Sequence, residues 1–206
     1  MKGKFITFEG SEGSGKSTQI DLVRDYLEDR KIETQFLREP GGVQISEKIR
    51  NLLLDVKNVE MSDECETLLY MAARAQLMSE VLLPSLKKGE HVLCDRFLDS
   101  TIVYQGYGNG VDIEIIRKLG QFITQGAKPD LTLIFDIDAK TGLSRIKHSK
   151  DRIERRAIAY HNRVRQGYIK LSQQEPLRVK LIQADHKSKE EIFEEVRTHI
   201  DRVFCL

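Results

Sequence analysis

The sequence predicts an α/β protein in which one parallel sheet is flanked by helices. Short runs of β-branched and aromatic residues alternate along the chain with longer segments of helical periodicity. Strands separated by helices favour parallel β-α-β crossovers and therefore one doubly wound sheet. In addition, a glycine-rich segment stands between the first strand and the first helix, which is the context in which phosphate-binding loops occur.

Strands and helices follow one another along the whole chain. Strands are predicted at 5–8, 33–37, 91–94, 131–137 and 179–182. Helices are predicted at 16–29, 44–54, 62–87, 112–125, 139–147, 153–173 and 188–203. A turn is expected at 38–43, where Pro40 excludes a helix. Because no internal repeat or linker is found, one domain is expected over residues 1–206.

The composition is that of a soluble globular protein. The 206 residues are 40% hydrophobic and 32% charged, and the formal net charge of +1 gives no reason to expect a nucleic-acid partner. Three widely spaced cysteines without a C-x-x-C pair argue against disulfides or zinc and indicate a reducing compartment. No apolar run approaches the ~20 residues of a membrane span. A cytoplasmic location without membrane association is therefore expected.

Residues 10–17 match the phosphate-loop pattern G-x-x-x-x-G-K-[ST]. Glycines allow backbone N–H groups to turn toward phosphate oxygens, and the helix N-terminus adds its positive end. The lysine would reach the β- and γ-phosphates, and the Ser17 hydroxyl would bind Mg²⁺. A flexible turn is the alternative, but the flanking strand and helix favour a three-layer P-loop NTPase fold. The expected ATP-binding residues are Gly10, Ser11, Glu12, Gly13, Ser14, Gly15, Lys16, Ser17 and Thr18.

Asp95 and Arg96 end the third predicted strand, where open α/β sheets bind ligands. The carboxylate is expected to hold Mg²⁺ directly or through a water, with the arginine facing phosphate. An acidic turn residue is the alternative. Asp136 and Asp138 end the next strand and are interpreted as caps of the following helix.

Other cations suggest a second phosphate site and a lid. Arg38, Arg50, Arg74 and Arg96 lack obvious helical acid partners, and together they would clamp an acceptor phosphate. Between residues 145 and 165, eight Lys or Arg side chains stand against two acids. A short mobile lid over ATP, at about 145–156, would place cations near the transferred phosphoryl group. The lid candidates are Arg145 for phosphate binding, and Lys150 and Arg152 for catalysis. For Arg155, Arg156, Arg163 and Arg165 a solvated helical face is an equal alternative.

Five motifs in the same order resemble those of the bacterial thymidylate kinase family. They are F-E-G-S-E-G-S-G-K-S-T from residue 8, R-E-P-G-G from 38, A-A-R-A-Q from 72, D-R-F-L-D-S-T-I-V-Y-Q-G from 95 and D-R-I-E from 151. The resemblance implies a homodimeric P-loop nucleoside monophosphate kinase with a five-stranded parallel sheet. It would transfer a phosphoryl group from ATP to dTMP with Mg²⁺. The alternatives are a kinase for another nucleoside or deoxynucleoside monophosphate and a nucleotide-binding regulatory protein.

The resemblance also implies roles for single residues. The acceptor phosphate would be held by Arg38, Arg50 and Arg96. The base would be bound by Tyr70 through stacking, by Arg74 and Gln105 through hydrogen bonds, and by Thr101 nearby. The sugar would meet Tyr104 at its 2′ position and Glu12 at its 3′-hydroxyl. The resemblance further implies a cis Glu39–Pro40 peptide. Two departures are Tyr70, where phenylalanine is more usual, and a short lysine-rich lid.

Overall fold

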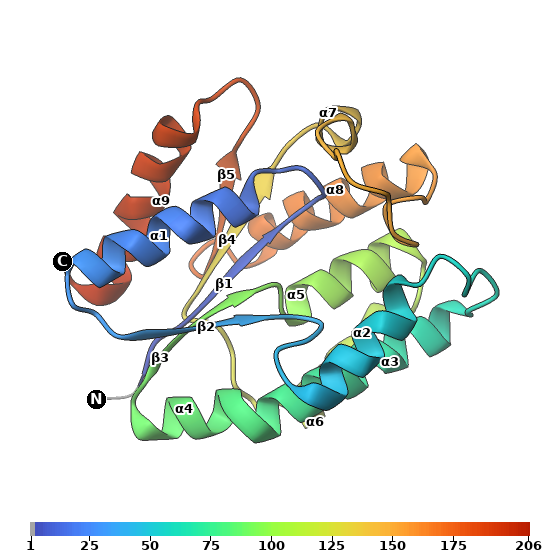
Figure 1. Ribbon diagram of the computed structural model, residues 1–206, viewed down its shortest axis with the longest axis horizontal. Helices are drawn as coiled ribbons and strands as arrows, with labels where there is room; N and C mark the ends of the chain where they lie inside the picture. The colour runs from blue at the N-terminus through green and yellow to red at the C-terminus, as the bar shows by residue number, and fades with distance from the viewer. Residues whose placement is uncertain (1–2) are drawn as a thin grey trace.

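The computed structural model describes residues 3–206 and contains one five-stranded parallel sheet (Figure 1). Its strand order is β2-β3-β1-β4-β5, with every neighbouring pair parallel. The fold predicted from the sequence is thereby confirmed. The strands are β1 (Phe5–Gly10), β2 (Thr34–Arg38), β3 (His91–Asp95), β4 (Leu131–Asp136) and β5 (Val179–Gln183).

Helices form the two outer layers. The longer ones are α1 (Lys16–Asp29), α2 (Gln44–Leu54), α3 (Asp63–Leu77), α6 (Ile113–Thr124), α8 (Ile158–Gln174) and α9 (Lys189–Phe204). The shorter ones are α4 (Leu83–Lys88), α5 (Leu98–Thr101), α7 (Ala139–Ser144) and the π-helical segments η1 (Met78–Leu82) and η2 (Ile102–Gly108). Within residues 3–206, no helix is long and apolar enough to cross a membrane.

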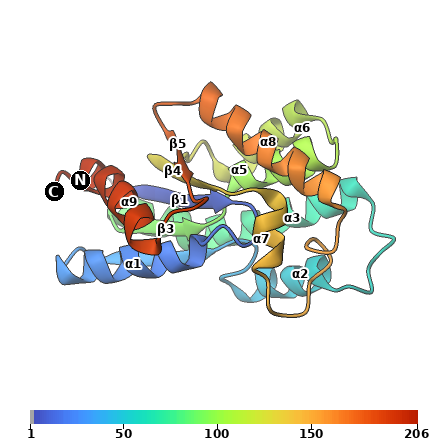
Figure 2. The same ribbon diagram turned by 90° about the horizontal axis from the view of Figure 1, so that it is seen from above.

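Both faces of the sheet are buried, as is expected for parallel strands. Helices α1 and α9 cover one face, where Phe8 and Phe135 stack with ring centroids 6.5 Å apart. Helix α8 and segment η2 cover β4 and β5 on the opposite face. Figure 2, seen from above, shows α1 below the sheet and α8 above it. Because successive residues of a strand point to opposite faces, these short apolar strands contribute to both cores.

Two predicted helices have different limits, and one helical region was not predicted. The helix predicted at 139–147 ends at Ser144. The 153–173 helix begins only at Ile158, because the Asp151 side chain accepts hydrogen bonds from the backbone N–H groups of Ile153 and Glu154 and holds a turn there. Residues 98–108 form α5 and η2 although they contain the β-branched run 101–103. Such residues have low helix propensity, so only tertiary burial explains this segment.

The topology brings two chain segments together at the carboxyl edge of the sheet. Strands β1 and β3 are neighbours, with Phe8 paired to Asp95. The glycine-rich loop that follows β1 therefore lies beside the Asp95–Arg96 turn, although these segments are far apart in sequence. Above this edge, the segment between α7 and α8 reaches across to α2 (Figure 2), where the Arg152 Nε donates to the Leu53 carbonyl at 2.7 Å.

Candidate active site

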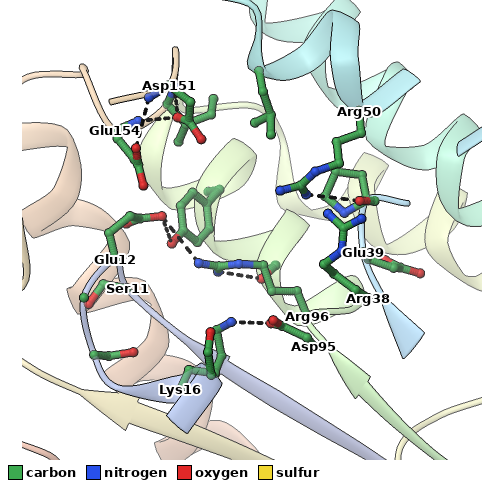
Figure 3. A pocket seen from close by; sticks show the side chains of 18 of the residues that line it. Ser11, Glu12, Lys16, Arg38, Glu39, Arg50, Asp95, Arg96, Asp151 and Glu154 are labelled. Atoms are coloured by element: carbon green, nitrogen blue, oxygen red, sulfur yellow. Dashed lines mark hydrogen bonds and ion pairs between the residues drawn. The ribbon is translucent and has the colours of Figure 1, made fainter. Parts of the chain in front are cut away.

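A cavity of about 610 Å³ opens at the carboxyl edge of the sheet (Figure 3). Most of the site residues predicted from the sequence line this cavity, whereas Gly10, Lys150 and Arg152 do not. The predicted residues in its wall are Ser11, Glu12, Gly13, Ser14, Gly15, Lys16, Ser17, Thr18, Arg38, Arg50, Tyr70, Arg74, Asp95, Arg96, Thr101, Tyr104, Gln105 and Arg145.

The glycine-rich loop is packed closely against α7. A Cβ at Gly13 would lie 2.1 Å from the Gly142 carbonyl oxygen, and a Cβ at Gly142 would lie 2.2 Å from the Glu12 carbonyl oxygen. Neither approach tolerates a side chain, so both positions require glycine. At the end of this loop, Lys16 is buried and forms an ion pair with Asp95. Burial and the charge of Arg96 lower the pKa of Lys16, while Asp95 opposes them.

Arg96 has a left-handed backbone conformation, with φ of 69°. This conformation is uncommon for a residue other than glycine and has to be held by its surroundings. Its N–H donates to the Phe8 carbonyl at 2.9 Å, and the next N–H, of Phe97, donates to the Glu9 carboxylate at 2.8 Å. Strand β1 therefore fixes the backbone on both sides of Arg96. The side chain then extends into the cavity toward Glu12 (Figure 3).

Glu9 is a fully buried carboxylate beneath Arg96. It accepts hydrogen bonds from the hydroxyl groups of Ser100, in α5, and Tyr168, in α8. The same two hydroxyl oxygens lie 3.2 and 3.3 Å from Arg96 Nη1. Burial, and next the charge of Asp99, raise the pKa of Glu9 to about 7. The carboxylate thus supports both the backbone and the guanidinium of Arg96.

Glu12 stands at the other end of the Arg96 side chain. Its Oε1 accepts a hydrogen bond from the Tyr104 hydroxyl at 2.7 Å and lies 3.4 Å from Arg96 Nη2. Its Oε2 lies 3.5 Å from Nδ1 of the buried His161. Burial alone would raise the pKa of Glu12, but His161, Arg96 and Tyr104 together lower it to about 2. An ionised carboxylate is therefore held at the mouth of the phosphate loop.

Arg38 and Arg50 approach the cavity from the wall opposite the phosphate loop (Figure 3). Arg38 pairs with Glu47 at 2.7 Å, and Arg50 Nη1 donates to the Pro40 carbonyl at 3.1 Å. The Glu39–Pro40 peptide is cis, as the resemblance implied. Three guanidinium groups from β2, α2 and the turn after β3 therefore converge on one cavity.

A buried arginine closes the floor of the cavity near α3. Arg74 is only 2% exposed, donates to Glu39 through Nε at 2.8 Å and to the Thr101 hydroxyl through Nη2 at 3.0 Å. Gln105 lies nearby in η2 with its amide nitrogen 2.9 Å from Glu66. Tyr70, one turn before Arg74 on α3, is half-buried. These polar groups come from three segments that are distant in sequence: the turn after β2, helix α3, and the contiguous α5 and η2.

The lid candidates occupy different places. Arg145 lies at the phosphate loop, where its Nη1 donates to the Gly13 carbonyl at 3.3 Å. Arg152 is buried and its guanidinium lies 2.7 Å from the Glu66 carboxylate, so it anchors the lid segment in this structure. Lys150 lies outside the cavity wall. The mobility of the segment at 145–156 stays a prediction.

The alternative of a solvated face is wrong for Arg156 and Arg165, which are half-buried in ion pairs. Arg156 pairs with Glu66 at 2.8 Å, and Arg165 donates two hydrogen bonds to the buried Asp136. Arg155 and Arg163 are exposed, in agreement with that alternative, although each also donates to a backbone carbonyl. Asp136 is therefore an ion-pair partner and not a helix cap, which corrects the interpretation above. Asp138 is the N-cap of α7, as expected, because its side chain accepts from the Thr141 N–H.

Sequence reasoning missed several residues of the site. The supporting carboxylates Glu9 and Glu66, and the partners Ser100, His161 and Tyr168, were not singled out. Glu9 directly precedes the phosphate loop, so a charged residue ending an otherwise apolar strand was the available signal. For Glu66 the pattern contained no signal, since one acidic residue in the first turn of a helix is ordinary. The structure also places Glu39, Pro40, Leu54, Phe97, His148, Asp151, Ile153 and Glu154 in the cavity wall.

A phosphate loop and a triad of arginines that share one cavity define a P-loop phosphotransferase with a phosphorylated acceptor. The model of the thymidylate kinase family matches residues 8–196. Over 200 residues the chain is 43% identical to thymidylate kinase of Clostridium novyi, which covers 95% of this chain and 97% of that protein. It is 46% identical over 192 residues to the enzyme of Pelotomaculum thermopropionicum, with 92% and 89% covered.

A solved structure of thymidylate kinase from Ehrlichia chaffeensis has the same fold. It superposes with a TM-score of 0.79 at 33% sequence identity, and the match covers 97% of this chain and 99% of that one. The chain therefore belongs to the thymidylate kinase family, whose members are ATP-dependent nucleoside monophosphate kinases.

Glu9→Gln is expected to change how stability depends on pH. The folded-state pKa of Glu9 is about 7, above its ordinary 4.5. Between these values the unfolded chain releases the proton that the folded protein retains, so this group's stabilisation is complete below pH 4.5 and is lost as pH rises through 7. Urea denaturation should show that the free energy of unfolding of the wild type, relative to that of Glu9→Gln, falls by at most about 3 kcal/mol from pH 4.5 to pH 8. Parallel curves of unfolding free energy against pH for the two proteins would contradict this role. Glu64→Gln, at an exposed position, serves as control.

Gly142→Ala is expected to reduce activity although Gly142 touches no predicted substrate position. The new Cβ would displace the Glu12 carbonyl and with it the phosphate loop. Displacements of about 1 Å near reacting groups cost on the order of a hundredfold in rate. Steady-state kcat/KM measures the effect, with the exposed Lys140→Ala of the same helix as control. Equal activity in both variants would show that the close approach is dispensable.

Proposed function

We propose that this cavity transfers the γ-phosphoryl group of ATP to dTMP and yields dTDP and ADP. The observation that carries the proposal is the position of two phosphate-binding sets on opposite walls of one cavity. The glycine-rich loop supplies backbone donors and Lys16, while Arg38 and Arg50 face it from β2 and α2, with Arg96 between them (Figure 3). Family membership supports this assignment of donor and acceptor.

The donor nucleotide would lie along the phosphate loop. The backbone N–H groups of this loop and the N-terminus of α1 would bind its phosphates. Lys16 would leave its ion pair with Asp95 and contact phosphate oxygens instead. Arg145, which already contacts the loop, would add a cation at its outer side. Movement of the lid would bring Lys150 closer to the transferred group.

The acceptor phosphate would lie between the three arginines. Guanidinium groups bind phosphate through paired N–H donors, and convergence of several of them fixes the acceptor oxygen for in-line attack. Since a nucleoside monophosphate is already anionic, positioning and charge neutralisation by Arg96 can carry the step without a general base. Glu12 then marks the sugar position, next to the Tyr104 hydroxyl that would crowd a 2′-hydroxyl group.

Residues around α3 and η2 suit a thymine ring. Tyr70 would stack on the base, with Arg74 and Gln105 at its polar edge and Thr101 nearby. A buried base leaves its carbonyl and N–H groups unsatisfied unless such partners are present, at a cost of about 1–3 kcal/mol for each group. The pocket therefore selects bases by their hydrogen-bond pattern.

Magnesium is the proposed cofactor. The Ser17 hydroxyl and the Asp95 carboxylate line the same cavity beside Lys16, and hard oxygen ligands of this kind fit Mg²⁺, which takes its remaining ligands from phosphates and waters. The ion would neutralise charge on the donor phosphates. Ser17 and Asp95 would hold it, directly or through water.

We further propose a homodimer in the cytoplasm. Helices α2, α3 and α6 expose large apolar side chains, including Leu52 at 52%, Leu68 at 56% and Phe122 at 82%. Exposed apolar groups on neighbouring helices support contact with a second copy of the chain. The reducing compartment is supported by the three cysteines, which are all free.

Arg96→Ala is expected to lower kcat about a hundredfold or more, because the positive charge next to the transferred phosphoryl group is lost. Arg117→Ala is the control, since Arg117 is half-exposed on α6 and pairs with Glu114 on its own helix. Steady-state kinetics with ATP and dTMP measures both. Similar kcat values for the two variants would remove Arg96 from the catalytic set.

A coupled ADP-release assay tests the substrate. Turnover is expected with dTMP, more weakly with dUMP, and much less with dCMP, dGMP and thymidine, because only the first two offer the same polar base edge with a phosphate. Turnover of dCMP or dGMP as fast as dTMP would instead indicate a kinase for another monophosphate. No turnover with any monophosphate would indicate a nucleotide-binding regulatory protein.

A further inference from the structure

The Glu66 side chain joins the base end of the cavity to the lid segment. It lies in the first turn of α3 and is fully buried. Its Oε1 accepts hydrogen bonds from Gln105 Nε2 at 2.9 Å and from Asn109 Nδ2 at 3.0 Å. Its Oε2 lies 2.8 Å from Arg156 Nη2 and 2.7 Å from Arg152 Nη2. One carboxylate thus faces four donors from η2, from the turn that follows it, and from the segment before α8.

These donors keep Glu66 ionised. Burial would raise its pKa, but the Gln105 amide and the charges of Arg156 and Arg152 bring the pKa below its ordinary value. An ionised carboxylate only accepts hydrogen bonds. It therefore determines which end of the Gln105 amide faces it, a choice that amide geometry alone leaves open.

The amide nitrogen of Gln105 must turn toward Glu66, so its carbonyl oxygen Oε1 turns away. Gln105 is 1% exposed and lines the cavity, and among residues 3–206 no group donates a hydrogen bond to its Oε1. A carbonyl at the edge of a binding cavity without a protein donor is suited to accept from a ligand N–H.

Pyrimidine bases differ at the atom that such a carbonyl would meet. Thymine and uracil carry an N–H at N3, which donates, whereas N3 of cytosine is an acceptor and would repel a carbonyl oxygen. We infer that Glu66 is a positioning residue for base specificity, which holds the Gln105 carbonyl as an acceptor for the imide N–H and ties this contact to the lid through Arg152 and Arg156. The inference rests on the proposed function, since it presupposes a thymine base in this cavity.

A purely structural role for Glu66 makes a different prediction. Loss of the ion pairs alone would lower the stability of the fold and would weaken the binding of dTMP and of dCMP by the same factor. Loss of the amide orientation would instead change their ratio, because a released Gln105 can present its NH₂ group to the cytosine N3. The ratio of the two affinities therefore separates the two roles.

Glu66→Gln is the test, with Glu64→Gln as matched control. Glu64 lies on the same helix and is exposed. Dissociation constants for dTMP and dCMP would be measured by calorimetry, alongside kcat/KM for both and the melting temperature. In Glu66→Gln the dCMP-to-dTMP ratio of dissociation constants should fall about tenfold or more, a typical size for one mismatched buried polar contact. In Glu64→Gln it should keep the wild-type value. An unchanged ratio in Glu66→Gln, or an equal fall in both variants, overturns the inference.

A reciprocal pair of substitutions provides a second test. In Glu66→Gln combined with Gln105→Glu, the amide at 66 donates to the carboxylate at 105, whose other oxygen again offers an acceptor to the base N–H. The preference for dTMP should return to within about threefold of wild type, although the anchoring of Arg152 and Arg156 stays weakened. A ratio as low as in Glu66→Gln alone would contradict the orientation argument.

A ligand analogue needs no variant and remains informative if Glu66→Gln fails to fold. In 3-methyl-dTMP the imide hydrogen is replaced by a methyl group, so wild-type protein should bind it about a hundredfold or more weaker than dTMP. Binding equal to dTMP would show that no acceptor faces N3 and would overturn the inference. Failure of the proposed function is distinct, because wild-type protein would then not phosphorylate dTMP at all.

Discussion

The hydrogen bonds that Glu9 accepts fix the positions of the chain segments around the cavity relative to one another. This buried carboxylate ends the strand that carries the phosphate loop, and it binds the Phe97 N–H, the Ser100 hydroxyl and the Tyr168 hydroxyl. Two separate segments, the one from Phe97 to α5 and helix α8, are thereby fixed to β1. A buried carboxylate without such donors would be costly, so the arrangement is stable only when all three are in place. The left-handed backbone of Arg96 depends on the same contacts.

A second buried carboxylate organises the opposite end of the cavity. Glu66 connects the helix that carries Tyr70 and Arg74 with the lid segment and with Gln105. Its contacts explain why Arg152 is buried beside it and does not line the cavity. Glu9 supports Arg96 and Glu66 holds Gln105, and both of these side chains line the cavity, so its shape depends on buried acids as well as on arginines.

Much of the fold could be predicted from the sequence because its signals are local. Five short apolar strands with intervening helices are visible in the pattern of residues along the chain, and so is the phosphate loop at residues 10–17. The helical turn at 98–108 could not be predicted, since its β-branched residues 101–103 disfavour a helix and only burial against α8 and the sheet stabilises it. The ion pair of Asp136 could not be predicted either, because its partner Arg165 lies 29 residues away in sequence.

By itself, the sequence determined the class of fold, the phosphate loop with Lys16, and most of the residues that line the cavity. Those features depend on spacing along the chain and on local backbone preferences. Only the tertiary structure decided how the side chains are oriented: that Arg96 rests on Glu9, that Gln105 turns its amide nitrogen to Glu66, and that Arg152 pairs with Glu66 and does not line the cavity. Such choices depend on which donors and acceptors meet across the fold, and contacts between distant residues leave no periodic trace in the sequence.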